Sequence, residues 1–236
     1  MENRRKYTTP RGVNGKDRRR KQHESRAVRN RRLRKKRLLR KRFFLLLALV
    51  VCLCVGFRLQ HKYMSVWMVS RMAVVSVPEW IDVQYIPEGN PSRSEERLEA
   101  VRDIVVHYVG NPGTTAQANH DYYCHEDSVV CSHFVVGLEG EIILCLPLNE
   151  RSAASNHRNK DTISIEVCHP DDTGKFSDAT YDSLVRLVAW LTDICHLDTE
   201  HVIRHYDVTG KECPRYYVRN EDAWIQFKED VDRTIR

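Results

Sequence analysis

The side chains best suited to chemistry in this chain are an imidazole and a thiol eight residues apart, at His205 and Cys213. Lys211 lies between them, and a third candidate ligand, His107, lies far upstream in an apolar segment. Two nitrogens and one sulfur would hold zinc through three protein groups and leave a fourth position for water, which is typical of catalytic zinc. The alternative is a strand-end histidine beside an unrelated buried cysteine. Spacing alone does not decide between the two, because no H-E-x-x-H or C-x-x-C pair is present.

Four segments occur in an order that a known family shares. They are Val-Val-His-Tyr at 105–108, Ser-His-Phe-Val-Val-Gly at 132–137, Thr-Ile-Ser-Ile-Glu-Val at 162–167, and the stretch 205–214. Over residues 81–231 the chain thus resembles the zinc-dependent N-acetylmuramoyl-L-alanine amidases of type 2, which include phage lysozyme-like amidases and resemble the peptidoglycan recognition proteins. The resemblance implies a peptidoglycan hydrolase that cleaves the amide between N-acetylmuramic acid and L-alanine of the stem peptide, using a zinc-activated water.

The resemblance also implies roles for the site residues. One zinc ion would be held by His107, His205 and Cys213. Glu166, which interrupts an apolar strand, would be the proton shuttle, and Lys211 would stabilise the tetrahedral oxyanion. The alternatives are a rim carboxylate paired with a surface lysine for Glu166 and an exposed loop charge for Lys211.

One position departs from the family pattern. Phage amidases and catalytic recognition proteins carry a tyrosine before the histidine of the segment at 132–137, and that tyrosine assists the attacking water, whereas this chain has Ser132. Either Glu166 acts alone or a nearby tyrosine such as Tyr108 contributes. We expect further substrate contacts from Tyr108, Asn111, Asn156, His157 and Arg158. For His157, the alternative of equal weight is a solvated loop histidine that does not contact substrate.

A competing hypothesis from another class is a membrane-tethered peptidoglycan receptor without hydrolysis, as some recognition proteins are. Such receptors typically lose the thiolate ligand, whereas this chain retains Cys213 together with the other expected site residues. We therefore favour the enzyme.

The elements that must position these residues are predicted from hydrophobic patterning. Apolar runs predict strands at 81–86, 103–109, 132–138, 141–146, 162–168 and 201–205. Helices are predicted at 95–102, 115–125, from Ser177 as N-cap through 195, and at 221–233. Strands interleaved with helices predict an α/β domain over residues 92–236, a single mixed sheet flanked by helices. This matches the fold that the resemblance implies, with zinc in a groove at one side of the sheet and one membrane helix before the domain. We expect this domain to be monomeric.

The first 42 residues differ sharply in charge from the rest. They hold 20 Lys and Arg against 3 Asp and Glu, a balance of +17, so the remainder carries −11 of the whole-chain +6. Few apolar residues and strong repulsion predict a disordered cytoplasmic tail over 1–42. A nucleic-acid arm is the alternative, but the stretch lacks interleaved aromatic residues and leads straight into an apolar run, so we expect no specific nucleic-acid partner.

That apolar run predicts a membrane anchor at residues 43–59. Its 15 uninterrupted apolar residues, 43–57, cover about 22 Å as a helix, which is short of a bilayer core of roughly 30 Å unless flanking leucines and snorkelling basic residues extend it. A cleaved signal peptide is disfavoured, because its charged region would exceed forty residues and no A-x-A-like site follows the apolar run. A lipoprotein is disfavoured because no small residue precedes Cys52 or Cys54. The basic excess before the run places the N-terminus in the cytoplasm and the domain outside, in a single-pass protein of the bacterial cell membrane.

The stretch 60–91 is expected to be a juxtamembrane stalk or interfacial helix followed by a linker rich in Pro and Gly. Five cysteines remain outside the anchor and the ligand set: Cys124, Cys131, Cys145, Cys168 and Cys195. Their odd number leaves at least one without a partner inside the chain. Cys124 and Cys131 are near enough in sequence to bridge, and buried thiols are the default for the others.

Overall fold

The structure, a computed structural model, describes residues 15–235, and its two compact units divide between Gln60 and His61. Residues 1–14, the first part of the expected tail, lie outside the described residues.

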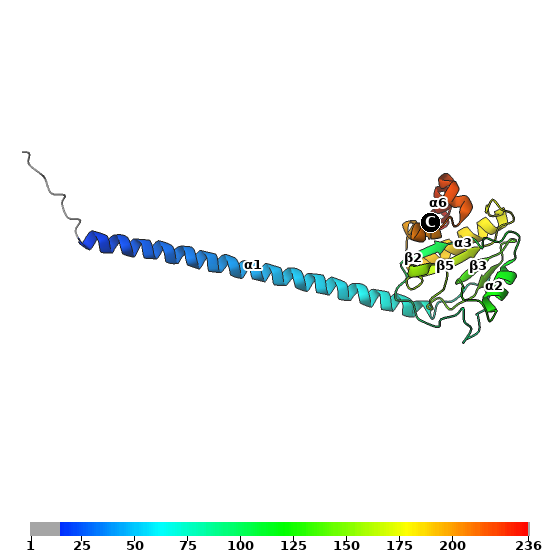
Figure 1. Cartoon of the computed structure of the whole chain (residues 1–236), viewed down its shortest axis with the longest axis horizontal. Helices are drawn as coiled ribbons and strands as arrows, with labels where there is room; N and C mark the ends of the chain where they lie inside the picture. The colour runs from blue at the N-terminus through cyan, green and yellow to red at the C-terminus, as the bar shows by residue number, and fades with distance from the viewer. Residues whose placement is uncertain (1–14, 236) are drawn as a thin grey trace, which may run out of the picture. The chain divides into compact units, whose positions relative to one another are not determined.

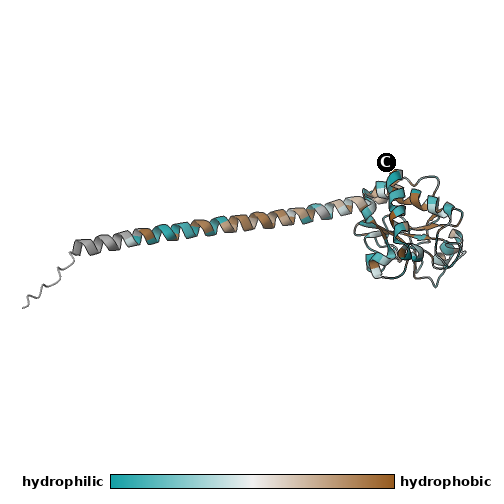
Figure 2. Cartoon of the chain, turned by 90° about the horizontal axis from the view of Figure 1, so that it is seen from above, coloured by the Kyte–Doolittle hydropathy of each residue, from teal (hydrophilic) through white to brown (hydrophobic). Residues whose placement is uncertain are grey.

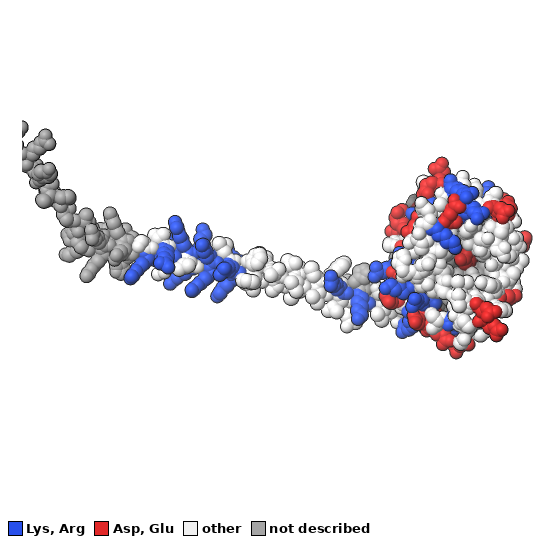
Figure 3. Space-filling model, in the orientation of Figure 1, with Lys and Arg blue, Asp and Glu red and all other residues white. Residues whose placement is uncertain are grey.

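The first unit is the larger part of helix α1 (Gly15–Met72). Lys and Arg gather on one stretch of this helix (Figure 3), and the stretch that follows them is apolar (Figure 2). Within Val28–Met72 an 18-residue window reaches a mean hydropathy of 2.3, so α1 is long and apolar enough to cross a membrane. Residues 15–42 are helical where we expected disorder, because Arg and Lys are good helix formers and the apolar stretch continues their hydrogen-bonding pattern.

The second unit is built on a six-stranded mixed sheet, which confirms the expected fold class. In spatial order the strands are β1 (Asp82–Val83), β4 (Ile142–Leu144), β3 (Phe134–Val136), β5 (Thr162–Val167), β2 (Asp103–Val106) and β6 (Val202–Arg204). The neighbours β3, β5, β2 and β6 run parallel, and β4 is antiparallel to β3. The hairpin expected between β3 and β4 is therefore present.

Helices cover both faces of this sheet (Figure 1). Helix α3 (Asp178–Cys195) contacts β2 and β3, and α6 (Glu221–Ile235) packs on α3. Helix α2 (Ala116–Cys124) packs on β3 and β4, in a second apolar cluster that contains Val135 and Ile143. Since successive strand residues point to opposite faces, the two clusters lie on opposite sides of the sheet.

Local caps explain where two of these helices begin. The side chain of Ser177, the expected N-cap of α3, accepts a hydrogen bond from the backbone N–H of Thr180. Thr115 does the same for α2 through the N–H of Ala118. Each cap satisfies a backbone donor that the first turn of a helix leaves free.

The helix predicted at 95–102 is wrong. Glu95 has a positive φ of 58°, and the backbone N–H groups of Leu98 and Glu99 donate to the carbonyls of Asn149 and Lys160. These hydrogen bonds to a distant segment replace the i to i−4 bonds that a helix would need. Two short helices that the sequence analysis did not predict flank the Cys213 segment: α4 (His205–Thr209) and α5 (Arg215–Arg219).

The stretch expected to be stalk and linker contributes to the core of the second unit. Val69 and Met72 at the end of α1, and Ile81 and Ile86 around β1, are all buried. Trp80 packs edge-on against Trp190 of α3 and beneath the guanidinium of Arg186, 3.8 Å from the ring centroid. The folded unit thus begins well before residue 92.

Two residues in this stretch provide a matched test. Met72 is 3% exposed and its sulfur lies 3.9 Å from Cys195 Sγ, whereas Val74 is 80% exposed. We expect Met72→Ala to lower the free energy of unfolding by about 2–5 kcal/mol, because it leaves a cavity. Val74→Ala should change it by less than about 0.5 kcal/mol. Urea unfolding of the full chain in detergent, followed by tryptophan fluorescence, measures both, and equal effects would show that residues 61–91 lie outside the cooperative unit.

Candidate active site

Strand register brings three of the expected site residues into one row. Val106 pairs with Ile165 of β5 on one side and with Arg204 of β6 on the other. One residue further on, these registers place His107 beside Glu166 and His205. Parallel strands lie about 4.8 Å apart, so the three side chains meet on the face opposite Ile104 and Val106.

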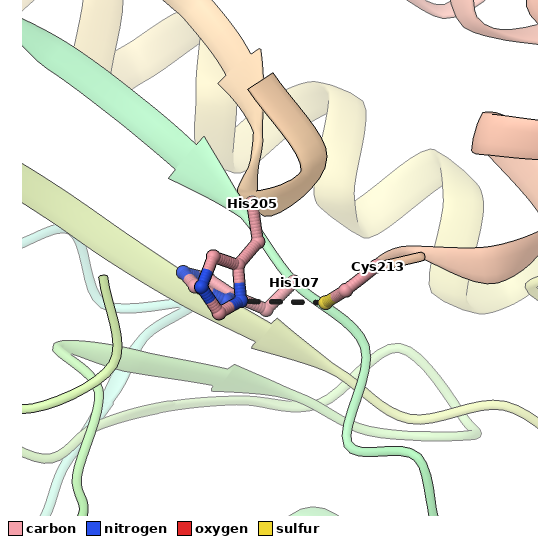
Figure 4. A group of neighbouring side chains, drawn as sticks. All are labelled: His107, His205 and Cys213. Carbon is pink, nitrogen blue, oxygen red and sulfur yellow. Dashed lines mark hydrogen bonds between the residues drawn. The ribbon is translucent and has the colours of Figure 1, made fainter. Parts of the chain in front are cut away.

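The thiol of Cys213 completes the group (Figure 4). Its Sγ lies 4.0 Å from Nδ1 of His107, and the imidazole rings of His107 and His205 lie 4.5 Å apart between centroids. One ligand atom from each of the three residues falls within 4.8 Å of the others, and all three residues are buried. A backbone hydrogen bond holds Cys213 beside this row of residues: the N–H of Tyr206 in α4 donates to the carbonyl of Cys213 at 2.9 Å.

Hydrogen bonds on the far side of each ring orient the two histidines. Nε2 of His107 lies 3.1 Å from Ser155 Oγ, and Nε2 of His205 lies 2.8 Å from Asn156 Oδ1. The amide oxygen only accepts, so the His205 Nε2 carries the proton and its Nδ1 keeps a free lone pair. Both rings thus turn Nδ1 toward the interior of the cluster.

These atoms fit a zinc ion. Bonds of about 2.0 Å to nitrogen and 2.3 Å to sulfur at a tetrahedral angle would separate the two ligand atoms by about 3.5 Å, so the observed 4.0 Å needs only a small contraction. Burial lowers the pKa of both histidines, with the charge of Lys211 adding to the effect, so their rings are neutral and able to bind a metal. Burial raises the pKa of the Cys213 thiol to about 12, so metal binding would have to displace its proton.

Glu166 lies beside the cluster with an unpaired oxygen. Its Oε1 lies 3.9 Å from Nδ1 of His107, and its buried Oε2 has no hydrogen-bond partner among the described residues. Burial raises the pKa of this carboxyl to about 8, and the charge of Lys211 opposes the shift. A carboxyl whose pKa lies near neutrality beside a metal cluster is suited to exchange protons.

Lys211 is exposed, yet its charge acts on the whole row. It adds to the burial that lowers the pKa of His107 and His205, and it opposes the burial that raises the pKa of Glu166 and Cys213. Because this ammonium group combines access from solvent with proximity to the ligands, it can meet the negative charge of a reacting group at the cluster.

The other expected site residues lie around the cluster in different ways. Tyr108 is partly buried, stacks on His169 at 5.0 Å between centroids, and lies beneath Arg215. His157 and Asn111 are exposed. Arg158 forms ion pairs with Asp103 and Asp161, so its guanidinium anchors a loop rather than facing a groove.

Tyr123, rather than Tyr108, lies beside Ser132, the position at which this chain lacks the tyrosine of the family pattern. The hydroxyl of Tyr123, from α2, lies 3.4 Å from Ser132 Oγ, and burial followed by the charge of Glu166 raises its pKa well above the usual value. Sequence spacing gives no sign of this contact, because Tyr123 and Ser132 belong to different elements.

Sequence analysis also missed a buried polar network behind the ligands. Nδ1 of His133 lies 3.1 Å from Ser164 Oγ, its Nε2 donates to the carbonyl of Glu150 at 2.8 Å, and Ser164 Oγ donates to Ser152 Oγ. The network fixes strand β5 to the loop that carries Ser155 and Asn156. Its signal in the sequence is the polar alternation of Thr162, Ser164 and Glu166 along an otherwise apolar strand.

Comparisons with known proteins identify the family of this chain. The model of the N-acetylmuramoyl-L-alanine amidase family matches residues 97–216. The N-acetylmuramoyl-L-alanine amidase XlyA of Bacillus subtilis (strain 168) is 31% identical over 153 residues, which are 62% of this chain and 49% of that protein. BlyA, an amidase of the same organism, is 29% identical over 168 residues, 62% of this chain and 45% of its own length. The chain thus spans about half the length of these relatives.

Solved structures show the same fold. The structure of the catalytic domain of XlyA superposes with a TM-score of 0.57 at 29% identity and covers 64% of this chain and 98% of that domain. The structure of PlyL, at 21% identity and a TM-score of 0.58, covers 64% of this chain and 96% of its own and supports the fold alone. The chain belongs to the N-acetylmuramoyl-L-alanine amidase family, so the expected resemblance to type 2 amidases is confirmed.

The cluster predicts how zinc content should respond to substitution. We expect one zinc per chain in the wild type and a severe loss of affinity in Cys213→Ser, which replaces the anionic ligand by a neutral hydroxyl. Cys195→Ser, which alters a buried thiol beside Met72, is the matched control and should retain one zinc. Metal analysis after dialysis against a weak chelator measures both. Full occupancy in a His107→Ala/Cys213→Ala double variant would show that other residues are the ligands.

Proposed function

We propose that this protein is a zinc-dependent N-acetylmuramoyl-L-alanine amidase that cleaves the amide between N-acetylmuramic acid and L-alanine of peptidoglycan. The observation that carries the proposal is the row of Glu166, His107 and His205 across three strands, closed by Cys213. The relatives named as N-acetylmuramoyl-L-alanine amidases support the reaction, and membership of their family supports the substrate.

Amide hydrolysis needs a nucleophilic water, a polarised carbonyl and a proton for the departing amine. Zinc held by His107, His205 and Cys213 would supply the first two, as a Lewis acid that lowers the pKa of water and polarises the carbonyl. The protein supplies the rest. Glu166 accepts the proton that the attacking water loses and passes it to the leaving nitrogen, a role that suits a carboxylate oxygen with no other partner in the described structure.

Lys211 stabilises the charge that develops on the carbonyl oxygen. Its ammonium group is exposed but close enough for its charge to act on the pKa of Glu166 and of all three ligand residues. Negative charge that develops on the substrate carbonyl oxygen would gain from that positive charge, whereas the neutral carbonyl gains less, so the interaction favours the transition state.

The membrane part of the proposal is supported by α1. Its basic stretch precedes the apolar stretch. By the positive-inside rule, this order favours a cytoplasmic N-terminus and an amidase unit outside the membrane. An extracytoplasmic position gives the enzyme access to peptidoglycan from a single-pass anchor in the bacterial cell membrane.

The test of the reaction uses purified cell-wall sacculi and counts new L-alanine amino termini. We expect the wild type to release them and Glu166→Gln to lose about 10²- to 10⁴-fold in turnover, because the amide cannot accept the proton. Lys211→Ala should lose about 10²- to 10³-fold. Both variants should keep their zinc, and Glu126→Gln, which alters an exposed carboxylate, serves as the matched control.

Two results would contradict the proposal in different ways. Near wild-type turnover in Glu166→Gln would assign the proton transfer to another group, for which Tyr108 and Tyr123 are the candidates. Binding to sacculi without any new amino termini would favour the receptor without hydrolysis.

Topology is tested by adding protease to intact protoplasts. We expect digestion of the amidase unit, since the positive-inside rule favours an extracytoplasmic position for it. Survival of the unit while a known external protein is digested would contradict this topology, and quantitative release of the intact unit into the medium would indicate a cleaved anchor.

A further inference from the structure

Two adjacent residues of one loop contact both histidines of the cluster. Ser155 Oγ lies 3.1 Å from Nε2 of His107, and Asn156 Oδ1 lies 2.8 Å from Nε2 of His205. The two histidines come from different elements almost a hundred residues apart. The loop therefore sets both ring orientations at once.

The loop is held in a specific conformation. Asn156 has a φ of 55°, in the left-handed region, and the backbone N–H of Ser155 donates to Asn159 Oδ1 at 2.6 Å. Arg158 then ties the turn to the start of β2 through Asp103 and to the end of the loop through Asp161. Asparagine tolerates the left-handed region better than other residues with a β-carbon, apart from aspartate.

We propose that Ser155 and Asn156 are positioning residues for the metal ligands, which keep Nδ1 of both histidines free and aimed at the metal. The inference rests on the proposed zinc site and assigns Asn156 a role other than the substrate contact expected from the sequence. Asn156 Oδ1, as an acceptor only, holds the proton of His205 on Nε2. Residues that hydrogen-bond to a metal ligand in this way fix its tautomer and raise its basicity. Their loss typically lowers metal affinity by about 10- to 100-fold.

The test measures zinc affinity by competition with a chromophoric chelator, on the full chain in detergent. Asn156→Gly removes the acceptor but accommodates the positive φ without strain, so we expect about 10- to 100-fold weaker zinc binding. Asn156→Asp restores an acceptor at the same place and should keep or exceed the wild-type affinity. Lys160→Ala, which alters an exposed residue of the same loop, is the control and should leave zinc affinity unchanged.

Ser155→Ala tests the same role through His107 and remains informative if Asn156→Gly fails to fold. It should also weaken zinc binding, while the urea midpoint of the metal-free protein distinguishes lost affinity from lost folding. Wild-type zinc affinity in both Asn156→Gly and Ser155→Ala would overturn the inference. So would a rise in KM alone in Asn156→Gly, since that result would make Asn156 a substrate contact. A wild type that binds no zinc would instead contradict the proposed function.

Discussion

The register of three parallel strands is the constraint on which this site depends. Because β5, β2 and β6 pair in the observed register, Glu166, His107 and His205 stand side by side on one face of the sheet. A slip of one residue in any of the strands would turn its site residue to the opposite face, which α3 covers. The apolar residues on that face, such as Ile104, Ile163 and Val202, therefore determine the positions of the site residues as well as the packing of the core.

The polar side chains of this buried row need hydrogen-bond partners. Ser155, Asn156 and the network of His133, Ser164 and Ser152 provide these hydrogen bonds behind the ligands. Among the described residues, three buried side-chain atoms have no hydrogen-bond partner: Glu166 Oε2, His169 Nε2 and Arg215 Nε. All three belong to the surroundings of the cluster, since His169 and Arg215 both contact the ring of Tyr108 next to His107. Buried polar atoms without partners are rare in folded proteins and gather where function requires them.

The amidase unit also depends on residues close to the apolar stretch of α1. The last turn of α1 supplies Val69 and Met72 to the core, and Arg71 contacts Nε2 of His196 at the end of α3. Trp80 and Ile86 continue this packing toward the edge of the sheet. Only a short part of the chain therefore separates the apolar stretch from the folded unit.

The sequence by itself determined the residues of the cluster, the main strands and the long helices, because each carries a local signal. His205, Lys211 and Cys213 are close in the chain, Glu166 interrupts an apolar strand, and α3 shows a regular apolar stripe with a capping serine. Hydrophobic periodicity and helix capping involve residues close together in the chain, so both can be recognised in the sequence without knowledge of the fold.

Only the tertiary structure decided which distant groups meet. The backbone at 95–102 is not helical because its N–H groups bond to the 149–161 segment. Residues assigned to a linker are buried because α3 offers them an apolar surface. The partners of His107 and His205, and the approach of Tyr123 to Ser132, depend on loops whose positions follow from packing. Such contacts join segments far apart in the chain, and no period or spacing in the sequence encodes them.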